Sequence, residues 1–253
     1  ERLEKAAPRF APGWFEHGKL LARTSNMGAL DLLRRRKAAD RVQKALDLDQ
    51  DNPFYLLELA RLRLKTPALR LDAERLFNRA LRAAEERKDP AVLAEVNWEL
   101  GQLHERRWAS VAHRHIITGT AATLDLNAAT NEWRYIPEFL ASQTAPVPGA
   151  GETQRIRAEE SYRRAVAADP SHEAAAASLL VLLYDTERFE EAVRFGRLAV
   201  TRQPVSARVH FGLGIALHRL DRLDEASKVL DSAFALLSET ERREMTSLSA
   251  LLT

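Results

Sequence analysis

Alanines recur at a fixed interval in the second half of this sequence of 253 residues. Ala158, Ala192 and Ala226 are separated by steps of 34 residues. Each is followed by another alanine seven positions later, and Pro170 and Pro204 close the first two segments. Apolar residues between these points recur at spacings of three and four, the period of an amphipathic helix. A helical repeat of this length predicts an array of stacked helix pairs.

The helices that precede these alanines also match one another. Leu179-Leu180 and Leu213-Gly214, counted from the second member, lie twelve residues ahead of Ala192 and Ala226. Small or flexible residues at such positions allow two antiparallel helices to approach closely. Each repeat is therefore expected to contain a first helix and a second helix that touch at these points.

A motif near the start of the chain identifies the type of repeat. Trp14, His17, Gly18 and Leu21 follow the spacing W-x2-L-G-x2-Y, and segments downstream follow A-x3-F and a closing proline. This pattern resembles the tetratricopeptide repeat. The resemblance implies a bacterial protein that folds as an all-α, right-handed α-solenoid and acts as a scaffold for protein-protein interaction. Interrupted arrays of this kind also precede GWxTD domains in some bacterial chains, although that motif is absent here.

The repeat register covers nearly the whole chain and predicts one solenoid domain over 1–253, with its third repeat split open. Gly101 lies 57 residues before Ala158, where the pattern expects 12, so about 45 inserted residues separate the two helices. An insertion in a solenoid leaves as a loop on one face, so the array can continue around it. The predicted repeats are 11–52, 53–89, 90–170 (interrupted), 171–204 and 205–238, with the insertion at about 107–152 and a C-terminal capping helix at 239–252.

The last segment also allows a second interpretation. Ser238 followed by Glu241 is a capping pattern, and Met245, Leu248 and Leu252 lie on one helical face. This fits a helix that covers the last repeat, or the beginning of a further domain. Because the sequence begins at Glu1 without a methionine, we expect a trimmed amino terminus, and the composition leaves localisation open between cytoplasm and periplasm.

Composition excludes several classes of function. The sequence contains no cysteine, so disulfides, thiolate nucleophiles and cysteine-based zinc sites are all absent. Basic and acidic residues nearly cancel, at a net charge of +2, which is weak for a dedicated nucleic-acid binder. We find no phosphate-binding glycine loop, no H-E-x-x-H pair and no G-x-S-x-G elbow, and no apolar run of about 20 residues. The sequence therefore predicts no enzymatic activity, no cofactor and no transmembrane segment.

Histidine and arginine clusters leave two rival hypotheses. His104, His113 and His115 lie at the start of the insertion, where imidazoles could bind zinc or copper in a metal-binding protein or an enzyme. No neighbouring carboxylate set completes such a site, so surface or packing roles are favoured. The run from Arg34 to Lys37 could contact phosphates in a nucleic-acid-binding array, but without an aromatic platform it is better explained as a solvated long turn entering a helix.

One stripe of each first helix is predicted to line the concave surface. By resemblance this surface is the usual peptide groove of tetratricopeptide proteins, and its aromatic and cationic residues suit a partner with acidic and apolar side chains. The candidate peptide-binding residues are Phe15, Lys19, Phe54, Leu57, Arg61, Trp98, Gln102, Tyr184, Arg208, Phe211 and His218.

The insertion offers a second candidate surface. It contains Trp133, Tyr135 and Phe139, more aromatic material than a passive linker carries. Either these rings fold back onto the array and modulate access to its groove, which is favoured, or they form an exposed element that binds a partner. The sequence thus predicts a non-enzymatic scaffold for a protein or peptide partner, without naming that partner.

Overall fold

The computed structural model describes residues 7–23, 29–65, 70–112 and 151–239. Within these ranges every regular element is an α-helix. The all-α fold class predicted from the sequence is therefore confirmed. The chain divides into two compact units, residues 1–100 and 101–253, referred to below as unit 1 and unit 2.

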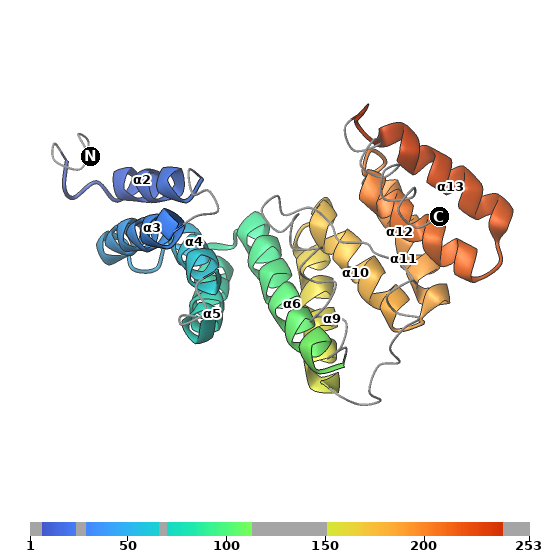
Figure 1. Cartoon of the computed structure of the whole chain (residues 1–253), viewed down its shortest axis with the longest axis horizontal. Coiled ribbons are helices and arrows are strands. Elements are labelled where there is room, and N and C mark those ends of the chain that lie inside the picture. The colour runs from blue at the N-terminus through green and yellow to red at the C-terminus, as the bar shows by residue number, and fades with distance from the viewer. Residues whose placement is uncertain (1–6, 24–28, 66–69, 113–150, 240–253) are drawn as a thin grey trace. The chain divides into compact units, whose positions relative to one another are not determined.

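Unit 1 contains two complete helix pairs and the beginning of a third (Figure 1). Helix α2 (Ala11–Arg23) packs on α3 (Ala29–Leu48), and α4 (Pro53–Leu64) packs on α5 (Arg70–Arg87). Helix α3 also contacts α4, which joins the first pair to the second. Helix α6 (Pro90–Ala112) begins in this unit and ends in unit 2.

Close backbone approach explains the glycine in the first helix pair. A Cβ atom on Gly18 would lie 2.6 Å from Val42 Cγ2 and 3.0 Å from the carbonyl oxygen of Ala38, both on α3. Only a glycine fits at this contact. The start of α4 is set by Asn52, whose side-chain oxygen accepts hydrogen bonds from the N–H groups of Phe54 and Tyr55, at 3.1 and 3.3 Å.

Unit 2 contains the rest of the split third pair and two further complete helix pairs. Helix α9 (Glu152–Ala168) contacts α10 (Glu173–Asp185), which pairs with α11 (Phe189–Arg202). Helix α12 (Ala207–Arg219) pairs with α13 (Leu223–Leu236) and packs against both α10 and α11. Successive hairpins in this unit therefore contact one another, as the repeat predicts (Figure 1).

The two halves of the split repeat touch within unit 2. A Cβ atom on Gly101 of α6 would lie 2.4 Å from Cε1 of Tyr162, a fully buried ring on α9. The predicted pairing of these two helices across the insertion is confirmed. Helix α6 extends to Ala112, so the first residues assigned to the insertion are helical.

The point where the chain rejoins the array lies beside α6. Gly151 has a φ of +70°, and a Cβ atom there would lie 3.4 Å from the Cα atom of Trp108. Because Trp108 lies one turn before the end of α6, the described chain stops and resumes at neighbouring places. Residues 113–150 connect these two places.

Three turns between helices hold non-glycine residues with left-handed backbone. Lys88 lies between α5 and α6 with a φ of 53°, Glu187 between α10 and α11 with 58°, and Asp221 between α12 and α13 with 55°. Such values are uncommon for residues that carry a Cβ atom. Each lets the chain reverse in a few residues.

Helix α3 contradicts one expectation from the sequence. The run from Arg34 to Lys37 lies inside α3, so its interpretation as a long turn is wrong, because the extra residues lengthen the helix. The predicted capping helix at 239–252 lies outside the described residues from 240 onward. None of the described helices is both long enough and apolar enough to span a membrane.

Candidate functional site

The candidate residues on α2 form an aromatic and cationic contact with α4. The ring of Phe15 lies against that of Tyr55, with centroids 4.6 Å apart. Lys19 Nζ lies 5.2 Å from the centroid of the Phe15 ring and 3.4 Å from Oε1 of Glu16. The side chains of Phe15 and Lys19 therefore already contact other side chains of unit 1.

Helix α4 presents one exposed aromatic ring. Phe54 lies two residues after the Asn52 cap and keeps 50% of its surface exposed. Leu57, predicted to share the same surface, is only 5% exposed because it packs in the core of unit 1. Phe54 is thus available for contact, whereas Leu57 offers little surface.

Arg61 is held by three carboxylates. Its Nε donates to Oε1 of Glu99 at 2.6 Å, its Nη2 contacts Oε1 of Glu95, and its Nη1 lies 3.9 Å from Oε2 of Glu58. Burial alone would lower the pKa of Arg61, but the carboxylates of Glu99 and Glu95 outweigh it and raise the pKa above its usual value. This guanidinium fixes α4 to α6 and remains cationic.

The two candidates on α6 lie in different surroundings. Trp98, in unit 1, is 6% exposed. Gln102, in unit 2, is half-buried, and its Oε1 accepts a hydrogen bond of 3.2 Å from Nη2 of Arg106, one turn further along α6. Neither residue presents a large side-chain surface.

Unit 2 contains an aromatic pair capped by a cation. The rings of Tyr184 and Phe189 meet edge to face with centroids 5.3 Å apart. The guanidinium carbon of Arg219, on α12, lies 5.9 Å from the Tyr184 centroid and 5.1 Å from that of Phe189. Phe189 and Arg219 were not among the predicted site residues. Phe189 begins α11, five residues after Tyr184, and Arg219 directly follows His218 in the next repeat, so only the packing of α10 to α12 brings them together.

The other candidates on α12 are more open. Phe211 is half-buried, with its ring 6.2 Å from that of Phe234 on α13. Arg208 Nε lies 3.9 Å from Oε1 of Glu173 on α10, and His218 is exposed. Unit 2 therefore offers aromatic, cationic and imidazole groups along its first helices.

A hydrogen bond joins Tyr162 on α9 to a carboxylate near the end of the first helix α6. The hydroxyl of Tyr162 donates to Oε2 of Glu105 on α6. Burial raises the pKa of Glu105, and this exceeds the opposing effects of the Tyr162 hydrogen bond and of nearby Arg106. The Tyr162 hydroxyl is buried too, and burial together with Glu105 raises its pKa well above the ordinary value.

His104 has a packing role in unit 2. It is 7% exposed, and its Nδ1 lies 2.8 Å from Oε1 of Gln154 on α9. The described part of the chain contains no cluster of three or more His, Asp or Glu side chains suited to a metal ion. His113 and His115 lie outside the described residues, as do the insertion aromatics Trp133, Tyr135 and Phe139.

Comparison with known proteins identifies the fold of this chain. No protein-family model matches the sequence, and neither does any curated protein. Among solved structures, YrrB, described as a TPR protein with an unusual peptide-binding site, is 16% identical, with a TM-score of 0.51 and coverage of 100% of this chain and 99% of its own. MamA from Desulfovibrio magneticus RS-1 is 14% identical with a TM-score of 0.51, covering 89% and 94%. The chain therefore has the fold of tetratricopeptide-repeat proteins.

Proposed function

We propose that this protein is a non-enzymatic scaffold that binds a protein or peptide partner along the first helices of its hairpins. The observation that carries the proposal is the exposed ring of Phe54 on α4, whose neighbours Tyr55 and Leu57 are buried. An aromatic side chain left half in water on a first helix is a suitable anchor for a partner. The similarity in fold to YrrB, a TPR protein with a peptide-binding site, supports this direction.

The chemistry expected of the partner follows from which cationic side chains are already paired with carboxylates of the protein itself. Arg61 is surrounded by three carboxylates and Lys19 lies near Glu16, so unit 1 favours apolar contact over acidic groups. In unit 2, Arg208 is 3.9 Å from its nearest carboxylate and about a third exposed. We therefore assign apolar anchoring to unit 1 and any preference for acidic residues to Arg208. Modulation of access by the insertion remains part of the proposal.

The anchoring role of Phe54 can be tested with peptides. A randomised display library is selected on the full chain, and the affinity of enriched peptides is measured by fluorescence anisotropy. We expect Phe54→Ala to weaken binding about tenfold or more, as loss of a central aromatic anchor does. Leu33→Ala is the matched control, because Leu33 is 56% exposed in the same unit but lies on the second helix α3. Equal losses in both variants, or no enriched peptide, would contradict the proposal.

The acidic preference is tested separately in unit 2. Arg208→Gln should weaken binding of peptides that contain Asp or Glu more than binding of their amide versions. Arg202→Gln, an exposed arginine at the end of the second helix α11, is the control that changes net charge equally. Identical losses of affinity for acidic and amide peptides would show that Arg208 does not recognise a carboxylate of the peptide.

A further inference from the structure

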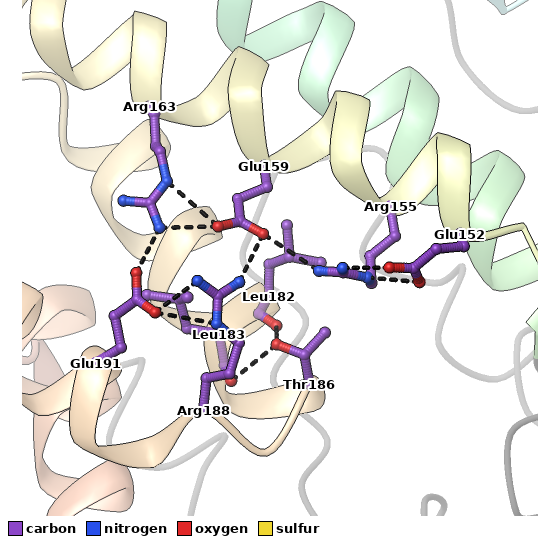
Figure 2. Close-up of polar contacts among 9 residues, drawn as sticks. All are labelled: Glu152, Arg155, Glu159, Arg163, Leu182, Leu183, Thr186, Arg188 and Glu191. Carbon is purple, nitrogen blue, oxygen red and sulfur yellow. Dashed lines mark hydrogen bonds and ion pairs between the residues drawn. The ribbon is translucent and has the colours of Figure 1, made fainter. Parts of the chain in front are cut away.

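A second set of charges repeats along the second helices of unit 2. In the first rung, Arg163 Nη2 lies 2.6 Å from Oε1 of Glu191, and Arg188 Nε donates to Oε2 of Glu191 at 3.0 Å. This rung joins α9 to α11 and is drawn in Figure 2. Arg188 is the residue immediately before α11, so the rung also fixes the turn that leads into that helix.

The second rung repeats the first 34 residues later. Arg197 Nη2 lies 2.8 Å from Oε2 of Glu225, and Arg222 Nε donates to Oε1 of Glu225 at 2.8 Å. It joins α11 to α13, and Arg222 is the residue immediately before α13. Because all three residue types and their contacts recur at the repeat period, we treat the two rungs as one structure, the second-helix ladder. At the next step of 34 residues from Arg197 the sequence has Asp231.

The two rungs differ in composition at two positions. Glu159 adds to the first rung: it accepts from Arg163 Nη2 at 2.8 Å and from Arg188 Nη1 at 2.7 Å, and it also contacts Arg155 (Figure 2). The positions equivalent to Glu159 and Arg155 in the next repeat are apolar, Val193 and Phe189. The second rung therefore lacks the carboxylate that links the arginines of the first.

The side chains of the first rung are also less exposed to solvent than those of the second rung. The side chain of Glu159 is 13% exposed and that of Glu191 is 30% exposed. In the second rung Arg197 and Glu225 are 53% and 47% exposed. Exposed ion pairs are weak and strongly screened by salt, whereas networks of partly buried charges are screened less.

The difference between the two rungs bears on the order in which the hairpins of unit 2 separate. In a helical array each hairpin contacts only its neighbours, so the array opens one joint at a time. We propose that the second-helix ladder is a salt-sensitive latch graded along unit 2, so that the α12–α13 hairpin separates before the joint between α9 and α11 opens. This inference rests on the fold and its ion pairs alone, and holds whether or not the proposed partner binding is correct.

Hydrogen exchange on the full chain measures the latch directly. Peptides from α12–α13 and from α9 are followed by mass spectrometry at about 0.1 M and about 1 M sodium chloride, which shortens the screening length from about 10 Å to about 3 Å. Salt should accelerate exchange of α12–α13 about two- to fivefold and change α9 less. Equal acceleration of both regions, or of neither, would overturn the proposal.

Variants separate the effect of the ladder from ordinary fraying of the α12–α13 hairpin. Glu225→Gln should accelerate exchange of α12–α13 in low salt and remove most of its response to added salt. Glu160→Gln is the control, because Glu160 is 58% exposed and its pair with Arg164, at 4.0 Å, stays within α9. A response to salt that persists unchanged in Glu225→Gln, or that Glu160→Gln also removes, would show that the rung is not the latch.

Discussion

Glu105 shows how a single carboxyl group can link helices and still oppose folding. It accepts a hydrogen bond from the buried hydroxyl of Tyr162, yet burial raises its pKa. A raised pKa means that the charged form is less favourable in the folded state than in the unfolded chain. The unfavourable contribution is therefore absent below the unfolded pKa of about 4.3 and grows as pH rises towards neutrality.

Glu105→Gln should consequently stabilise the protein at neutral pH. Glutamine keeps an oxygen that accepts from Tyr162 and removes the partly buried charge. We expect a higher urea midpoint than the native chain at pH 7, and no difference at about pH 4, where the native carboxyl is itself largely protonated. Glu160→Gln on the exposed face of α9 controls for net charge. A gain of the same size at both pH values would contradict the assignment.

At the scale of helices, the contact between α6 and α9 depends on a missing side chain. Gly101→Ala would place a methyl group 2.4 Å from the ring of Tyr162, which is fully buried. We expect a loss of about 1–3 kcal/mol in the free energy of unfolding, typical of overpacking, measured by urea unfolding followed by circular dichroism. A Gly101→Ala variant as stable as the native protein would refute the close contact.

Gly13→Ala provides the matched control for that substitution. Gly13 lies in α2, and among the described residues its new methyl group would meet only Phe10, 3.1 Å away in a side chain that is 49% exposed. Phe10 can move, and alanine favours a helix over glycine by about 1 kcal/mol. This variant should be as stable as the native chain or slightly more so.

The repeat period made these helix contacts predictable from the sequence. The repeat pattern and its motif located Gly18, Gly101 and Gly214, because close backbone approach excludes large side chains wherever two helices cross. It located them even across the insertion. The first helices, their partners and the split third repeat followed from this single constraint.

The environment of the candidate site was less predictable, for a physical reason. Arg61 lies on the stripe expected to face a partner, but the two carboxylates that lie closest to it are 34 and 38 positions away on another helix. Helical periodicity gives the direction of a side chain relative to its own axis only. It cannot say that Leu57 and Trp98 are covered or that Arg61 is already paired, because those outcomes depend on neighbouring helices.

At the scale of the whole chain, the insertion should be removable. Gly151 lies beside Trp108, so a short glycine and serine linker in place of residues 113–150 can connect α6 to α9. We expect the variant to keep its cooperative thermal transition and the circular dichroism of its helices, because Gly101 and Tyr162 contact directly. Loss of cooperative unfolding would show that the third repeat depends on the insertion.

The same variant tests the proposed modulation of access. If the insertion controls the first-helix surface, peptides selected on the native chain should bind the shortened chain with an altered affinity, and their dependence on Phe54 should remain. Unchanged affinity would remove the insertion from the proposed function and leave the scaffold itself intact.

The left-handed turns at Lys88, Glu187 and Asp221 have a consequence for engineering. Each keeps a side chain where glycine would relieve roughly 1 kcal/mol or more of backbone strain. All three lie between helices, but the N–H groups of Glu187 and Asp221 donate to the carbonyl oxygens of the candidate residues Tyr184 and His218, at 2.9 and 3.0 Å. Lys88, whose N–H donates to the carbonyl oxygen of Glu85, is therefore the place where this scaffold could be made more resistant to heat without touching a residue of its proposed recognition surface.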